Sequence, residues 1–237
     1  MISVITPSVR HEGLPVVEKA LKRQTMDFEW LIGSPKRPEN LTIPFIWVKD
    51  PPKDKGDYWV LFKSYNALIR ECKGELIVSI QDHTFFDPEA LEKFWYHYQE
   101  EPKTLVTGVG NKYSDETWMT TTWQDPRERT DYGSYYQCSH RDIEFNFCSI
   151  PTEAFYAVGG FDEYMDKYSS LCGLDVVERL NAIGGWDFKI DQTNRSYSTE
   201  HGRPDGWEEN NAIYGPWTER VKFYIENGPV LDYLKRK

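Results

Sequence analysis

The sequence lacks a hydrophobic run long enough to cross a membrane. Its longest apolar stretches last only about five or six residues, whereas a membrane helix needs about 20. Met1 is followed directly by the short apolar segment 2–5, with no basic region before it, so the pattern of a secretion signal is also missing. We therefore expect a cytoplasmic protein with no transmembrane segment.

Cysteine is scarce and widely spaced. The 237 residues contain four cysteines, Cys72, Cys138, Cys148 and Cys172, and no two of them form a CxxC pair. This spacing argues against a zinc ribbon and against a disulfide scaffold. We expect reduced thiols or small buried hydrophobic side chains.

Positive charge is also in short supply. The 28 Lys and Arg residues against 38 Asp and Glu residues give a net charge of −10, and the longest basic cluster is 235–237. A surface of this sign repels phosphate backbones. Nucleic acid is therefore not an expected partner, although a modified base stays open as an acceptor.

The regular pattern is an alternation of short apolar strands and amphipathic helices. Strands are predicted at 1–6, 28–32, 41–48, 76–80, 104–109, 143–150, 186–190 and 196–198, and helices at 14–25, 58–72, after Asp87, from Pro151, at 174–183 and at 217–225. This order predicts a single α/β domain with a mixed, mainly parallel sheet and helices on both faces. Ligands of such sheets bind beyond the carboxyl ends of the strands. Residues 81–83 follow the most apolar strand and occupy that position.

Residues 110–141 interrupt this periodicity for about thirty residues, which is long for a connection inside a compact domain. The segment is rich in aromatic rings with polar neighbours, including Trp118 and Trp123. Such rings suit the faces of sugars, but they equally suit a secondary core beneath a long loop.

Several motifs, taken in order, resemble those of the family 2 glycosyltransferases of the GT-A fold. The matching stretches are Ile2–Pro7, Leu21–Gln24, Phe28–Ile32, Lys63–Ile69, Lys73–His83, Asp87–Lys93, Val158–Glu163 and Gly173–Leu180. The resemblance covers most of the chain. It implies a nucleotide-sugar-binding half at 1–110 and an acceptor-binding half with the catalytic base at 111–237 of the same domain.

The resemblance implies a divalent cation, Mn²⁺ or Mg²⁺, against the diphosphate of the donor. Asp82 and His83 stand at the metal positions, His201 stands where a later histidine completes the shell, and Gln81 stands beside them at the donor. Such a cation stabilises the charge of the departing diphosphate. The motif departs from the family because Gln81 and His83 replace aspartates. Without the resemblance, Asp82 reads equally well as a turn-capping residue beside a solvated histidine.

The resemblance also implies the contacts of the donor nucleotide. They come from the ends of the first two strands, from the helix at 58–72, from the motif at 81–83 and from the late loop: Thr6, Pro7, Ser8, Arg10, Gly33, Lys63, Asn66, Gln81, Asp82 and Arg203. The family's acid after the second strand is missing, because only Gly33 and Ser34 remain there.

The resemblance implies that Asp175 is the catalytic base, a role that a carboxylate can fill by accepting the proton of an attacking hydroxyl. The alternative is a helix-stabilising acid near an N-terminus, worth about 0.3–1 kcal/mol. Trp118, Trp123, Asp162 and Glu163 are the candidate acceptor contacts.

These residues predict an inverting glycosyltransferase that moves a sugar from a nucleoside diphosphate, UDP being favoured, to a hydroxyl acceptor such as a glycan. A carbohydrate-binding module or degenerate transferase is the non-catalytic alternative, because the metal motif is altered. A sugar-1-phosphate nucleotidyltransferase fits less well, since the segment 7–13 contains one glycine where that class needs a glycine-rich phosphate loop.

Overall fold

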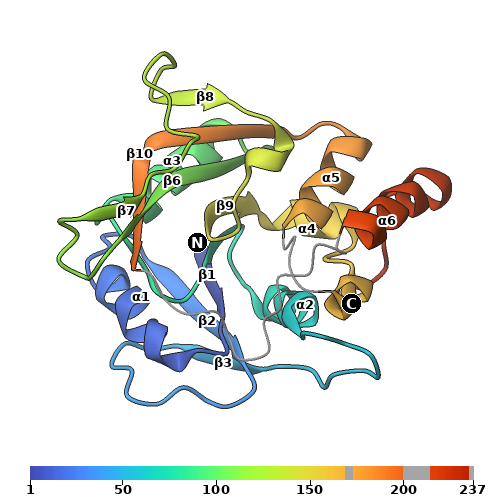
Figure 1. The fold of residues 1–237 in the computed structure, drawn as a ribbon, viewed down its shortest axis with the longest axis horizontal. Coiled ribbons are helices and arrows are strands. Elements are labelled where there is room, and N and C mark those ends of the chain that lie inside the picture. The colour runs from blue at the N-terminus through green and yellow to red at the C-terminus, as the bar shows by residue number, and fades with distance from the viewer. Residues whose placement is uncertain (169–172, 200–213, 235–237) are drawn as a thin grey trace.

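A single ten-stranded sheet forms the centre of the molecule (Figure 1). The computed structural model describes residues 1–168, 173–199 and 214–234. The main path of the sheet runs in the order β3-β2-β1-β4-β9-β6-β10-β5, with β7 beside β6 and β8 beside β10. The strands are β1 (Ile2–Pro7), β2 (Phe28–Ser34), β3 (Ile46–Lys49), β4 (Leu76–Ile80), β5 (Thr84–Phe86), β6 (Thr104–Tyr113), β7 (Thr121–Trp123), β8 (Tyr135–Gln137), β9 (Phe147–Pro151) and β10 (Asp187–Thr199).

The sheet is mixed. β1, β2, β3 and β4 are parallel, and β6 and β10 are parallel to each other. β9 lies between β4 and β6 and is antiparallel to both. The strands β1 to β4 therefore end at the edge of the sheet where β9 begins. We call this the carboxyl edge and define it by residues 8–10, 34, 50, 81–83 and 144–146.

Helices cover both faces of the sheet, as the α/β pattern predicts (Figure 1). The helices are α1 (Leu14–Leu21), α2 (Leu61–Glu71), α3 (Ala90–Glu100), α4 (Thr152–Val158), α5 (Leu174–Ile183) and α6 (Tyr214–Asn227), with short 3₁₀ turns η1 (His11–Gly13), η2 (His140–Asp142) and η3 (Glu163–Lys167). None of the helices within the described ranges combines the length and the apolar character that a membrane crossing needs.

Alternation along the strands divides the core into two layers. Ile5 of β1 and Ile77 of β4 pack with the side chains of α2, α4 and α5. Their neighbours Val4 and Val78 pack on the other face with α1 and α3. Successive strand residues point to opposite faces, so apolar residues at consecutive positions are what a sheet covered on both sides requires.

The two late strands predicted at 186–190 and 196–198 are one strand in the structure. β10 first pairs with β6 from Asp187 to Asp191, and the register then shifts before pairing resumes at Arg195. This irregularity interrupts the apolar alternation without ending the strand, as a β-bulge does. β6 is also longer than predicted, because residues 110–113 continue to pair with β10.

The start of α2 depends on a carboxylate from a distant segment. Asp166 in η3 is fully buried and accepts hydrogen bonds from the backbone N–H groups of Phe62 (2.9 Å) and Lys63 (3.0 Å). These are among the N–H groups that a helix leaves unpaired at its first turn. Burial raises the pKa of Asp166 to about 6, although the two backbone bonds oppose the rise.

Replacing Asp166 with alanine is expected to lower the free energy of unfolding by about 2 kcal/mol, because two buried N–H groups lose their acceptor. A raised pKa means that the folded state binds the proton more tightly, so Asp166 contributes more stability at pH 4 than above pH 6. The difference between wild type and Asp166→Ala, measured by urea unfolding, should therefore widen as the pH falls from 7 to 4.5. A difference that narrows would contradict the burial argument.

Candidate active site

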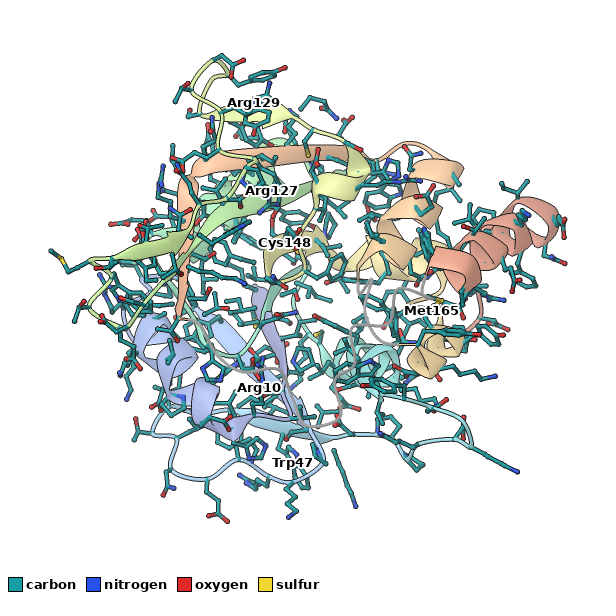
Figure 2. The ribbon with its side chains drawn as sticks, viewed as in Figure 1. Arg10, Trp47, Arg127, Arg129, Cys148 and Met165 are labelled. Atoms are coloured by element: carbon teal, nitrogen blue, oxygen red, sulfur yellow. The ribbon has the colours of Figure 1, made fainter. Side chains whose placement is uncertain are left out.

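The carboxyl edge contains an ion pair between the ends of two neighbouring strands. Arg10 follows β1, and both Nε (3.3 Å to Oδ2) and Nη2 (to Oδ1) donate to Asp82, which follows β4. The hydroxyl of Ser8 also donates to Asp82 Oδ2, at 2.9 Å. Asp82 is 5% exposed and the side chain of Arg10 is 18% exposed. Figure 2 shows Arg10 beside the ribbons of β1 and β2.

Local backbone contacts hold this pair at the edge. The N–H of Ser8 donates to the carbonyl of Gly33 at the end of β2, and the N–H of Arg10 donates to the Ser8 hydroxyl at 3.1 Å. The carbonyl of Arg10 accepts from the N–H of Gly13, and His83 donates its N–H to the Gly13 carbonyl at 3.2 Å. The loop after β1 and the motif after β4 are therefore one connected unit.

The donor set at this edge does not fit a divalent cation as it stands. Manganese and magnesium prefer several oxygen ligands, carboxylates above all, and only Asp82 of residues 81–83 supplies one. Both of its oxygens already accept bonds from Arg10 or Ser8. No group of three or more His, Cys, Asp or Glu side chains suited to a metal occurs within the described ranges. His201 falls outside those ranges.

A carboxylate that the sequence analysis missed lies at the end of β3. Asp50 donates its N–H to the carbonyl of Ser34 (3.1 Å) and accepts from the Ser64 hydroxyl at 2.7 Å. Burial raises the pKa of Asp50, against the effect of the Ser64 bond. An acid thus stands beside the end of β2, where the local sequence at 33–34 offers none. Only the parallel pairing of β2 with β3 brings it there.

Three predicted nucleotide contacts, Thr6, Pro7 and Gly33, are packed into the sheet or against α2. The Thr6 hydroxyl, fully buried, accepts from the Trp30 indole N–H at 3.1 Å. Gly33 lies so close to α2 that an added Cβ would meet the Ser64 hydroxyl at 2.4 Å. Pro7 is buried as the last residue of β1. These residues shape the edge, and their contact with a nucleotide stays a prediction.

The same holds for Lys63 and Asn66 on α2. The Lys63 ammonium pairs with Asp54 (2.7 Å) and Asp57 (2.5 Å), and these bonds raise its pKa against the effect of burial. The Asn66 amide accepts from the Phe161 N–H and donates to the Phe161 carbonyl, at 2.8 and 3.0 Å. Lys63 thus fixes the 54–57 loop, and Asn66 fixes the turn after α4.

Asp175 lies in a different cluster, with no surface exposed to solvent. It accepts from Arg179 Nε (2.8 Å) and Nη2 (2.7 Å), from the Tyr224 hydroxyl (2.8 Å) and from the N–H of Asp162 (2.7 Å). Asp162, also fully buried, accepts from Arg220, Tyr224 and Tyr164. Carboxylates with several donors each are the usual form of a buried, charged structural network.

This cluster ties the last three helices together. Burial alone would lower the pKa of Arg179, but the charge of Asp175 raises it. Burial raises the pKa of Tyr224, and the charges of Asp175 and Asp162 raise it further. α4, α5 and α6 therefore meet around one buried cluster of hydrogen-bonded side chains. No described contact joins Asp175 to Asp82, so the base role of Asp175 stays a prediction, and its geometry is that of a structural carboxylate.

The chain is similar to one protein family in sequence and to several solved structures in fold. Residues 59–163 match the model of the family described as Glycosyl transferase family 2. Three crystal structures of S. aureus TarS superpose on 98% of this chain, each with a TM-score of 0.63. They are residues 1–349 in complex with UDP (11% identity, 67% of that chain covered), residues 1–349 in complex with UDP-GlcNAc (10%, 68%) and TarS itself (11%, 40%). No curated protein matches the sequence.

The chain has the GT-A fold of these structures, and its residues 59–163 resemble the family 2 glycosyltransferases. At these identities the TarS structures show the shared fold and no more, and the chain spans only 40% of TarS itself. The matched residues 59–163 include Asp82 and β9. Arg10 and Asp175 lie outside them.

Glu144 is a second carboxylate that the sequence analysis missed. It precedes β9, and because β9 is antiparallel to β4, Asn146 accepts from the N–H of Gln81 at 3.1 Å. The Glu144 side chain is exposed, yet desolvation raises its pKa, while Arg127 opposes and Asp125 and Asp142 add to the rise.

The predicted acceptor residues separate into exposed and buried groups. Trp123 is 45% exposed, and the Lys112 ammonium lies 5.9 Å from its ring centroid. Trp118 stacks on Phe85 at 5.5 Å and is only partly exposed. Asp162 belongs to the buried cluster, and Glu163 accepts from Asn66 at 3.0 Å. Trp123 is thus the most accessible of the four.

One cavity lies away from the carboxyl edge. A cavity lined by Lys103, Glu153, Tyr156, Ala157, Trp186 and Leu234 opens near the starts of β6 and β10, at the opposite edge of the sheet. None of the predicted site residues that the structure describes lines it. Arg203 and His201 fall within 200–213, outside the described residues.

Replacing Asp175 with asparagine is expected to lower the free energy of unfolding by about 3–5 kcal/mol, because Arg179 is left as a buried charge without its partner. Urea unfolding measures the change. Glu178→Gln on the same helix is the control, since Glu178 pairs with Arg141 near the surface and such pairs contribute less than about 1 kcal/mol. Equal losses in the two variants would contradict a structural role for the Asp175 cluster.

Proposed function

We propose that the chain is a glycosyltransferase, which moves a sugar from a UDP-sugar to a hydroxyl acceptor with inversion at the anomeric carbon. The observation that carries the proposal is the convergence of Ser8, Arg10 and Asp82 from two neighbouring parallel strands on one edge of the sheet. Ligands of α/β sheets bind at this edge. The UDP and UDP-GlcNAc complexes of TarS, a protein of the same fold, support the choice of donor.

The proposed transfer needs no oxidant or reductant. The acceptor oxygen forms a bond to the anomeric carbon from one face while the bond from that carbon to the diphosphate oxygen breaks on the other. UDP leaves with the electron pair, and the proton of the hydroxyl passes to a base. The chain must therefore supply positive charge at the departing diphosphate and a carboxylate on the acceptor side.

The residues support a division of these tasks along the carboxyl edge. Arg10 supplies charge for the diphosphate, since a guanidinium matches phosphate oxygens with two parallel N–H donors. Asp50 stands at the end of β3 and suits a polar contact with the nucleoside. We keep the donor site in residues 1–110 and the acceptor site in 111–237, where Trp123 offers an exposed ring to a sugar face.

Two carboxylates compete for the role of base. Asp175 is the acid that the family resemblance implies, but four hydrogen bonds would have to be released before it could accept a proton from an acceptor. Glu144 is exposed, and Asn146, two residues further on, accepts from the N–H of Gln81. The exposure of Glu144 supports its choice as the base.

Donor use is tested by incubating the purified chain with a panel of UDP-sugars and measuring UDP release. We expect slow hydrolysis of one or more donors, because water replaces the missing acceptor. Trp123→Ala should keep this hydrolysis, since the ring is assigned to the acceptor. Formation of a nucleoside triphosphate from pyrophosphate would identify a nucleotidyltransferase, and binding of sugars with no turnover of any UDP-sugar would contradict the proposal.

The base is tested by comparing Glu144→Gln with Asp175→Asn. If Glu144 accepts the proton, Glu144→Gln should lower kcat for UDP release by about 10²–10⁴ while leaving the Kd for UDP and the Tm unchanged. Glu100→Gln, an exposed change at the end of α3 near the opposite edge, is the matched control. A normal kcat in Glu144→Gln would return the role to Asp175.

A further inference from the structure

We infer that the guanidinium of Arg10, in place of a divalent cation, is the positive charge that holds the diphosphate of the donor. This inference rests on the proposed function and concerns the same site. It starts from the disagreement between the cation that the family resemblance implies and the donor set at the carboxyl edge. The ion pair between Arg10 and Asp82 occupies the position where that cation would be held.

The carboxylate assigned to the metal is already satisfied. Asp82 accepts from Arg10 Nε and Nη2 and from the Ser8 hydroxyl, and it is nine-tenths or more buried. A cation at this point would have to displace the guanidinium from both oxygens. The positions on either side, Gln81 and His83, supply no second carboxylate to repay that loss.

Arg10 is built into this place by its own loop. Its N–H donates to the Ser8 hydroxyl, and its carbonyl accepts from Gly13 in η1. The same hydroxyl donates to Asp82, so one serine fixes both the backbone of the arginine and the acid that orients it. The arginine side chain keeps 18% of its surface exposed at the edge. An arginine ordered before binding loses less rotamer freedom when a ligand arrives.

The chemistry of the group suits a diphosphate. A guanidinium is always protonated and carries five N–H donors in a planar fork that matches phosphate oxygens. A diphosphate presents more acceptor oxygens and more negative charge than one carboxylate, and can therefore take over donors that Asp82 now holds. Asp82 is then a positioning residue that acts through Arg10, and the protein's net charge of −10 makes one fixed cation at this edge all the more necessary.

The test measures UDP binding by calorimetry, with metal-stripped protein in EDTA and again with Mn²⁺. We expect the two Kd values to agree within about threefold. Arg10→Gln should weaken UDP binding at least tenfold in both conditions, with no rescue by Mn²⁺. Its binding of uridine, which lacks the diphosphate, should stay unchanged when measured by competition. Arg129→Gln, an exposed arginine far from Arg10 in Figure 2, is the matched control.

Each other outcome has a separate meaning. UDP binding that requires Mn²⁺, or that is unaffected in Arg10→Gln, overturns the inference and leaves the proposed donor intact. Failure of the wild type to bind UDP in either condition overturns the proposed donor, and the inference with it. If Arg10→Gln does not fold, as judged by its thermal melt, the comparison of EDTA with Mn²⁺ in the wild type decides the question alone.

Discussion

The antiparallel pairing of β9 between β4 and β6 is the constraint on which the rest of the structure depends. Without this strand, the parallel sheet β3-β2-β1-β4 and the pair β6-β10 would have no shared ladder. Because β9 runs against its neighbours, its first residues meet the last residues of β4. The bond from Gln81 to the carbonyl of Asn146 marks that meeting point. One strand thus completes the core and brings residues 144–146 to the edge where Asp82 follows the fourth strand.

Two charged clusters divide the tasks of the molecule. The pair of Arg10 and Asp82 lies at an edge, where the Arg10 side chain retains some exposure. The pair of Arg179 and Asp175 has no exposure, and it anchors α4, α5 and α6 to one another. A fully buried pair of this kind is costly to break. The difference in exposure is why the proposal assigns a ligand to the first pair and a structural role to the second.

Much of the fold followed from local patterns. The continuous apolar run at 76–80 predicted a central strand, and the stripe from Tyr58 to Cys72 predicted the helix that became α2. The α/β class and the helices on both faces followed from their alternation. Element ends were less well predicted, because long-range contacts set them. Asp166, about a hundred residues further along the chain, accepts a hydrogen bond from the first turn of α2. Pairing with β6 extends β10 through an irregular stretch.

In the site too, some features follow from the local sequence and others only from long-range contacts. The sequence by itself determined that an arginine follows the first strand, that an acid follows the fourth, and that only one carboxylate stands among residues 81–83. Those facts are local, since strand order and residue type are written in the chain. Only the tertiary structure decided that Arg10 bonds to Asp82, that Asp50 and Glu144 join the edge, and that Asp175 is enclosed by Arg179 and Tyr224. The physical reason is that the hydrogen-bond partners and the burial of a side chain depend on which strands and helices become neighbours. The sequence around a residue does not specify those neighbours.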